Sequence, residues 1–133
     1  MNKIEVKNIQ DLSKVINCVK DSNKSIILLS GTLGSGKTTF VKEFVKSMGI
    51  DDNVTSPTFS IQNIYKNIHH YDLYNKDINE FLSLGMLEEL EKDGYHLIEW
   101  GEELEKHLKQ FGFDYLKIEI TLENDKRIFN CIV

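Results

Sequence analysis

The chain has 133 residues, of which 41% are hydrophobic and 28% are charged, and it carries a formal net charge of −5. This composition excludes a disordered chain, and no apolar run approaches the ~20 residues that cross a bilayer. The acidic balance argues against tight, direct binding of nucleic acid, because such proteins usually carry a basic face. We expect one domain over residues 1–133, located in the cytoplasm, since the N-terminus lacks the apolar segment of a secretory signal.

Cysteine and arginine are both scarce. The two cysteines, Cys18 and Cys131, lack the spacing of a disulfide framework, so we expect free core thiols. Arg127 is the single arginine. Kinases of nucleotides or metabolites generally clamp the transferred phosphoryl group with several arginines, and one arginine far along the chain cannot form such a clamp. We also expect no arginine to be available as a finger.

The N-terminal third predicts a strand, a helix and a second strand. Residues 3–7 alternate in the manner of a strand. Apolar residues at helical spacing between residues 12 and 19 predict a helix that Asp11 or Ser13 caps. Residues 25–30 read SIILLS, a short apolar run typical of a parallel strand buried on both faces.

A complete phosphate-binding loop pattern follows this strand. Residues 31–38 read GTLGSGKT and match GxxxxGK[ST]. The glycines allow a loop whose N–H groups point at phosphate oxygens, Lys37 supplies a cation for the β- and γ-phosphates, and the Thr38 hydroxyl is a ligand for Mg²⁺. The predicted nucleotide-binding residues of the loop are Leu33, Gly34, Ser35, Gly36, Lys37, Thr38 and Thr39. A helix follows, with an apolar stripe of Phe40, Val41, Phe44, Val45 and Met48, and ends at Gly49.

The remaining chain alternates between strands and helices. Residues 51–58 predict a polar loop, and residues 59–73 predict a hairpin that turns at Lys66-Asn67. Two short helices are expected, one capped by Asp77 and interrupted at Gly85, and one that starts at Met86 and continues to Asp93-Gly94. A buried strand at 95–99, a helix at 102–110 and a terminal hairpin at 115–133 complete the chain. We therefore predict an α/β, P-loop NTPase fold with a mixed, mostly parallel sheet flanked by helices.

A magnesium–nucleotide site needs a further carboxylate at the end of a strand near the loop. Asp72 and Glu99 both fit this position. Pattern alone slightly favours Glu99 as the metal ligand, because its strand is more apolar, whereas the run around Asp72 is too polar for a fully buried strand. The residues by themselves leave the two roles open.

The polar residues on either side of Asp72 and Glu99 give weaker evidence about function. His69 and His70 are adjacent strand residues that point to opposite faces, so they do not share one metal ion, and we expect a hydrogen-bonding role for His70 near Asp72. Residues 75–77 read NKD, which lacks the spacing of the guanine-reading motif. Trp100 follows Glu99, and its indole either stacks near the nucleotide or fills the core.

Four motifs in one order resemble the TsaE (YjeE) family, the small ATPase subunit of the bacterial machinery that makes threonylcarbamoyladenosine on tRNA. These motifs are residues 31–39 (GTLGSGKTT), 54–59 (VTSPTF), 70–74 (HYDLY) and 97–100 (LIEW). The resemblance implies that Asp72 holds Mg²⁺ and that Glu99 orients or activates the attacking water. It further implies that Trp100 sits near the nucleotide and that a nucleotide-sensing switch loop contains Thr55, Ser56 and Thr58.

The chain departs from the family pattern at three positions. Asn75 stands where the family often has arginine, so this chain lacks any contact that such an arginine makes. Thr32 stands where an acidic residue is common, and Gly101 where proline is common.

Three hypotheses result. The leading hypothesis is an ATPase that uses ATP and Mg²⁺, with Lys37, Asp72 and Glu99 as catalytic residues. It would serve TsaB- and TsaD-type partner subunits, meet tRNA only indirectly and contact no membrane. Its hydrolysis is expected to be slow in the isolated chain. The alternatives are a small-molecule or nucleoside kinase and a non-catalytic, nucleotide-gated interaction module.

Overall fold

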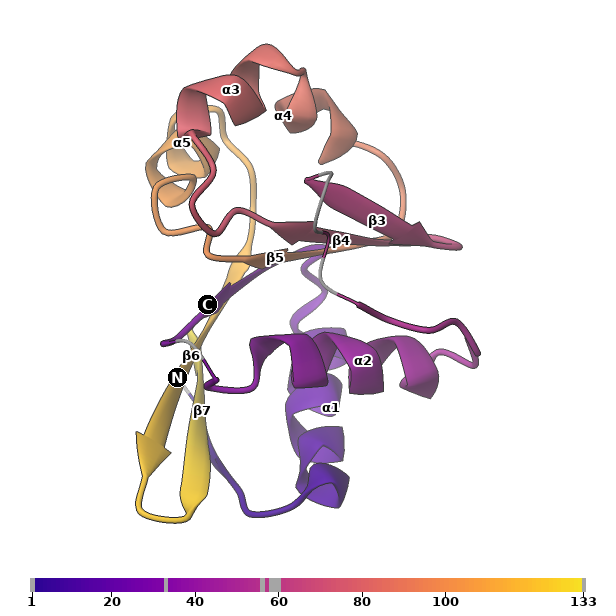
Figure 1. Cartoon of the computed structure of the whole chain (residues 1–133), viewed down its shortest axis with the longest axis vertical. Helices are drawn as coiled ribbons and strands as arrows, with labels where there is room; N and C mark the ends of the chain where they lie inside the picture. Colours follow the sequence, from indigo (N-terminus) through magenta and orange to yellow (C-terminus); the bar gives the residue numbers. More distant parts are fainter. Residues whose placement is uncertain (1, 33, 56, 58–60, 133) are drawn as a thin grey trace.

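Across the described residues, which are 2–32, 34–55, 57 and 61–132, one sheet of seven strands runs through the molecule in the computed structural model (Figure 1). Its strand order is β1-β7-β6-β2-β5-β4-β3. The strands are β1 (Asn2–Val6), β2 (Ile26–Ser30), β3 (Gln62–Tyr65), β4 (Ile68–Asp72), β5 (Tyr95–Glu99), β6 (Leu116–Glu123) and β7 (Lys126–Ile132). The helices are a 3₁₀ turn η1 (Ile9–Asp11), α1 (Leu12–Ser22), α2 (Lys37–Ser47), α3 (Ile78–Ser83), α4 (Met86–Glu89) and α5 (Glu105–Gln110).

The parallel part of the sheet is its centre. Strands β6, β2, β5 and β4 pair in parallel, while β1 with β7, β7 with β6, and β3 with β4 pair antiparallel. Both predicted hairpins are therefore present, although residues 58–60 of the first prediction lie outside the described residues. The prediction of an α/β fold with a mixed sheet is confirmed, with antiparallel strands at both edges.

Helices cover both faces of the sheet. Figure 1 shows α1 and α2 on one side and α3, α4 and α5 on the other. Alternate residues of β2 face the two layers: Ile27 and Leu29 pack with α1 and α2, and Ile26 and Leu28 pack on the opposite side. Burial on both faces explains why this strand reads as a continuous apolar run.

From the sequence, the run around Asp72 is expected to be too polar for a fully buried strand, and strand β4 shows that this expectation is wrong. Residues 68–71 are all buried, and His69, His70 and Tyr71 each have a hydrogen-bond partner inside the fold. The Tyr71 hydroxyl donates to Nδ1 of His96 at 2.7 Å, and Nε2 of His96 donates to the Lys92 carbonyl at 2.8 Å. Burial lowers the pKa of His96, which fits a neutral ring between these two bonds.

Three helix ends differ from the sequence prediction. Neither Asp11 nor Ser13 caps α1 through its side chain; instead Asn8 and Asp11 form a reciprocal capping box around η1, which leads directly into α1. Met48 is 36% exposed rather than part of the buried stripe of α2. Helix α5 begins at Glu105, because residues 102–104 form turns.

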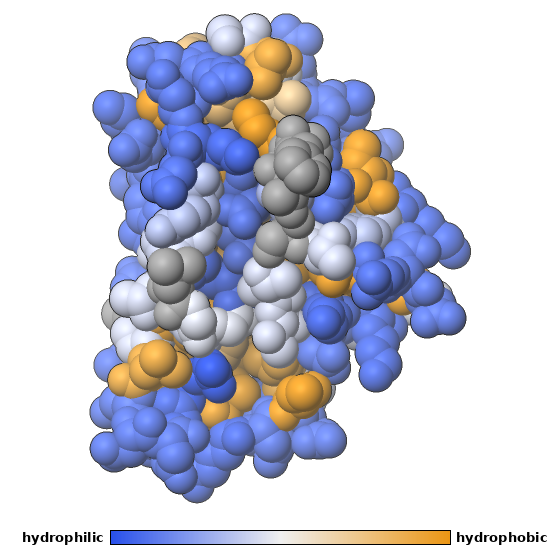
Figure 2. Space-filling model, in the orientation of Figure 1, coloured by the Kyte–Doolittle hydropathy of each residue, from blue (hydrophilic) through white to orange (hydrophobic). Residues whose placement is uncertain are grey.

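The outer surface is mainly polar. On the face drawn in Figure 2, hydrophobic side chains form several separate groups among hydrophilic ones. No helix among the described residues is long and apolar enough to cross a membrane. Cys131 is buried in β7 and Cys18 is half-buried on α1, and the two form no disulfide, as predicted.

Candidate functional site

The glycine loop joins the end of β2 to the start of α2, at the carboxyl edge of the parallel strands. Gly36 is the N-cap of α2 with φ of 112°, a left-handed conformation that favours glycine. A side chain at Gly31 would meet the Ser35 hydroxyl and the Ile120 carbonyl at 2.6 and 2.9 Å, so this position requires close approach. Leu33 lies outside the described residues.

Lys37 begins α2 and reaches back across the loop. Its Nζ donates to the carbonyls of Gly31 and Thr32 at 2.6 and 2.9 Å and lies 3.9 Å from the centre of the Trp100 ring. Burial lowers the pKa of Lys37, and the nearby carboxylates of Glu99, Glu102 and Asp72 oppose this shift. The loop therefore holds a cation with an oriented head group beside an aromatic wall.

The two candidate carboxylates lie side by side. Asp72 and Glu99 are paired in register at the ends of the parallel strands β4 and β5, so their side chains share one face of the sheet. Thr38 donates from its hydroxyl to both Glu99 oxygens at 3.0 Å, whereas Asp72 accepts from the Tyr74 N–H at 2.9 Å. Chain folding thus brings the loop threonine, Asp72 and Glu99 to one place.

These groups line one pocket of about 270 Å³. Its walls combine the loop, the two carboxylates and two aromatic rings, from Gly34, Ser35, Gly36, Lys37, Thr38, Thr39, Asp72, Tyr74, Glu99, Trp100 and Arg127. The rings of Tyr74 and Trp100 lie 4.8 Å apart. Trp100 thus borders the pocket and is only half-buried, which argues against a role as core filler alone, while its place near a nucleotide stays a prediction.

His70 lies behind Glu99 rather than near Asp72, which corrects the predicted partner. Its Nε2 donates to Oε2 of Glu99 at 2.6 Å, and the two side chains are 0% and 3% exposed. Nδ1 of His70 has no hydrogen-bond partner among the described residues. His69 faces the other way and stacks on His96 at 4.3 Å, so the prediction that the two histidines point to opposite faces is confirmed.

Arg127, which has no part in the site predicted from the sequence because it lies far along the chain, reaches the phosphate loop in the structure. Its Nε donates to the Ser35 carbonyl at 2.6 Å and its Nη2 to the Gly34 carbonyl at 3.3 Å. The sequence does predict the terminal hairpin that carries Arg127. It does not reveal that β6 pairs with β2, which brings the hairpin to the loop.

The described part of the predicted switch loop is tied to another hairpin. The Thr55 N–H donates to the Tyr65 hydroxyl at 3.2 Å, and the Thr55 carbonyl accepts from Asn63 Nδ2 at 3.1 Å. Thr55 is not among the described residues that line the pocket, and Ser56 and Thr58 lie outside the described residues.

The donor set fits a magnesium ion held together with a nucleotide. Thr38, Asp72 and Glu99 offer hydroxyl and carboxylate oxygens, which Mg²⁺ prefers. The described residues contain no group of three or more His, Cys, Asp or Glu side chains placed to hold a metal. Such a group is not required, because Mg²⁺ commonly uses one or two carboxylates, waters and substrate phosphates.

A strand, glycine loop and helix, with a lysine in the loop and carboxylates at the ends of adjacent parallel strands, define a P-loop protein. The family model described as threonylcarbamoyl adenosine biosynthesis protein TsaE matches residues 5–129. The chain therefore belongs to the TsaE family, which takes part in the biosynthesis of threonylcarbamoyladenosine in tRNA.

Individual relatives agree with this assignment. The chain is 42% identical over 109 residues to the tRNA threonylcarbamoyladenosine biosynthesis protein TsaE of Rickettsia typhi, covering 77% of this chain and 74% of that protein. The TsaE of Bacillus subtilis is 38% identical over 89 residues, which are 64% of this chain and 56% of that protein. The crystal structure of Bacillus subtilis YdiB superposes with a TM-score of 0.66 at 26% identity, covering 96% of this chain and 82% of that one.

Proposed function

We propose that this protein binds Mg²⁺ and ATP in the pocket beside the glycine loop and hydrolyses ATP in support of threonylcarbamoyladenosine formation on tRNA. The observation that supports the proposal most is that Lys37, Thr38, Asp72, Glu99 and Trp100 meet in one pocket. We further propose that it works in the cytoplasm with TsaB- and TsaD-type subunits and meets tRNA only through them.

Each group has a separate task in this proposal. Lys37 and the N–H groups of the loop bind the phosphates. Thr38 and Asp72 would hold Mg²⁺, which supplies positive charge that offsets the charge developing on the phosphates. Glu99 accepts a hydrogen bond from the attacking water and so fixes its position over the terminal phosphate.

Two contacts suit Glu99 to positioning. His70 donates to Oε2 from behind, inside the sheet layer, and Thr38 donates from the side of the loop. A carboxylate that is held from two directions is already oriented before the water binds. Little further orientational freedom is lost in the reaction, which favours catalysis by positioning. The sole arginine is bonded to loop carbonyls, so slow turnover by the isolated chain is expected, with partners supplying further groups.

The test compares two matched carboxylate variants, Glu99→Ala and Asp72→Ala. Binding of Mg-ATP is measured by calorimetry, and turnover by phosphate release with and without the partner subunits. We expect Glu99→Ala to retain Mg-dependent binding and lose turnover, and Asp72→Ala to lose the Mg dependence of binding. The reverse pattern would exchange the two roles.

Phosphate release also separates this proposal from the alternatives. Transfer of phosphate to an added small acceptor would identify a kinase. Nucleotide-dependent partner binding with no phosphate release, even in the assembled complex, would identify a non-catalytic module and refute the proposed hydrolysis.

A further inference from the structure

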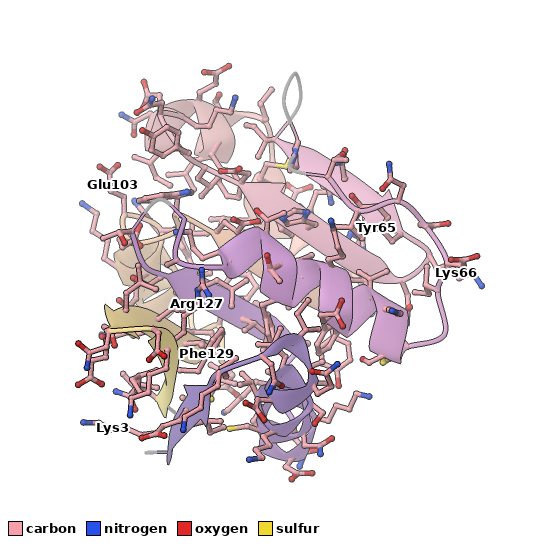
Figure 3. All side chains as sticks on the ribbon, turned by 60° about the horizontal axis from the view of Figure 1, so that its bottom comes forward. Lys3, Tyr65, Lys66, Glu103, Arg127 and Phe129 are labelled. Atoms are coloured by element: carbon pink, nitrogen blue, oxygen red, sulfur yellow. The ribbon has the colours of Figure 1, made fainter. Side chains whose placement is uncertain are left out.

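The sole arginine of the chain contacts the back of the phosphate loop from 92 residues away. Figure 3 shows the Arg127 side chain beside the loop that precedes α2. Nε donates to the Ser35 carbonyl at 2.6 Å, a distance typical of a charge-assisted hydrogen bond, and Nη2 donates to the Gly34 carbonyl at 3.3 Å. A single planar guanidinium thus spans two successive peptide groups of the loop.

Holding these two carbonyls also orients the amides that follow them. In a trans peptide, the C=O of one residue and the N–H of the next point in opposite directions. The Ser35 N–H therefore points away from Arg127, and it donates to the Thr32 carbonyl at 3.1 Å, which closes the loop on itself. By the same geometry the Gly36 N–H is directed away from the guanidinium, to the inner side of the loop.

The arginine also lies tightly against Gly36. A side-chain carbon added at Gly36 would lie 3.2 Å from Nε and 3.4 Å from Cδ of Arg127. Gly36 has φ of 112°, a conformation that glycine adopts readily and other residues rarely do. Arg127 therefore packs against the point at which the loop turns into α2.

The base of the arginine side chain is itself rigidly placed. Arg127 pairs with Val6 of β1 on one side and with Leu122 of β6 on the other. The neighbouring Lys126 forms an ion pair with Glu5 at 2.9 Å, which further links β7 to β1. A side chain that starts from a strand paired on both sides positions its contacts more precisely than one on a free loop.

From these contacts we propose that Arg127 is a positioning residue that holds the phosphate loop in its binding conformation, so that the terminal hairpin sets nucleotide affinity. The proposal rests on the proposed nucleotide binding at this loop. Arg127 acts through the Gly34 and Ser35 carbonyls and not through contact with the terminal phosphate. It therefore supports ADP and ATP equally, because the loop wraps phosphates that both nucleotides possess.

The experiment measures the affinity of the full chain for Mg-ADP and Mg-ATP by calorimetry. Arg127→Gln is expected to weaken both nucleotides by the same factor, about 10 to 100, the range for losing a hydrogen bond from a charged group. In turnover assays KM for ATP rises, while kcat at saturating ATP stays within about threefold. Lys3→Gln, on the adjacent strand β1, removes one positive charge from an exposed side chain; it is the matched control and leaves both affinities unchanged.

Arg127→Lys keeps the positive charge but not the planar fork, so it is expected to weaken both nucleotides as Arg127→Gln does. If Arg127→Gln does not fold, the nucleotide affinity of Arg127→Lys tests the proposal instead. Full affinity in Arg127→Lys would overturn the proposal, since charge alone would then suffice. Loss of ATP affinity with ADP unchanged would also overturn it, in favour of a contact with the terminal phosphate.

The outcome is separable from that of the proposed function. A wild-type chain that binds neither nucleotide refutes nucleotide binding itself. A wild-type chain that binds both, together with an Arg127→Gln variant of equal affinity, refutes only the role of Arg127.

Discussion

Replacing His70 with phenylalanine removes the 2.6 Å hydrogen bond to Glu99 and keeps a planar ring in the same buried space. Losing a bond to a charged acceptor costs about 1.5–3 kcal/mol. The substitution also removes Nδ1, which is buried and has no partner in the part of the chain that the structure describes, and removing such a group returns about 1–3 kcal/mol. The two effects oppose each other, so we expect a net change in the free energy of unfolding of less than about 2 kcal/mol.

The effect on turnover is expected to be much larger. Without His70, Glu99 keeps the hydrogen bond from Thr38 at one side and loses the one that holds it from behind, so its carboxylate is less restricted in rotation. Misplacement of a reacting group by about 1 Å costs up to 10²-fold in rate, so kcat is expected to fall by about 10- to 100-fold. Binding of Mg-ATP is expected to change by less than about threefold, because the phosphate contacts are untouched.

The matched control is His69→Phe, one residue away on the opposite face. His69 stacks on His96 and contacts Gln62 Nε2 at 3.1 Å, so this variant is expected to change stability and leave kcat alone. Thermal unfolding and phosphate release in the presence of partner subunits measure both quantities. Equal losses of kcat in the two variants, or an unchanged kcat in His70→Phe, would refute the role given to the His70–Glu99 pair.

Three further predictions concern the pocket wall, a turn and a titration. Trp100 is the only tryptophan, and its ring contacts the Lys37 ammonium. We expect Mg-ADP to change the fluorescence of Trp100, because the phosphates compete with the ring for this ammonium. The Lys37→Met variant should show no such change. Gly94→Ala should lower the free energy of unfolding by more than about 3 kcal/mol, because the added methyl group would overlap a backbone carbonyl of the β3–β4 turn. Gly85→Ala, where the added methyl group meets open space, should lower it by only about 1 kcal/mol. Denaturant titrations measure both values. Burial and a neighbouring carboxylate raise the pKa of Tyr115 to about 12, so its stabilising effect is complete below pH 10 and declines as the pH rises toward 12. Ultraviolet titration of the folded and unfolded chain measures this pKa, and ionisation near pH 10 in the folded chain would contradict it.

The local part of the site could be predicted from the sequence because each signal lies within a few residues. The apolar run of β2, the glycine pattern and the stripe of α2 are adjacent, so strand, loop and helix follow from short-range rules. Asp72 and Glu99 each end a strand, and parallel strands bring such ends to one edge. Their closeness is therefore a consequence of topology that the pattern already indicates.

The partners of buried polar groups could not be predicted in this way. The run around His70 looks too polar for the interior when it is considered alone. Its burial depends on Glu99 and His96, which belong to another strand and reach β4 only through sheet pairing. A polar side chain is stable inside a protein when it is hydrogen-bonded, and the sequence of one strand does not contain that information.

The position of Arg127 changes the electrostatic description of the site. Asp72 and Glu99 carry the negative charge of the pocket lining, and Lys37 and Arg127 carry its positive charge. Two negative charges against two positive charges leave no net charge, so the side chains alone do not attract a polyphosphate. A divalent cation would make the site positive, which supports the proposed dependence on Mg²⁺. Without Arg127 the same lining would carry one negative charge, and the loop N–H groups would have to overcome its repulsion. Arg127 therefore offsets a carboxylate charge at the pocket wall, while the affinity that the terminal hairpin adds comes mainly from the two hydrogen bonds that hold the loop.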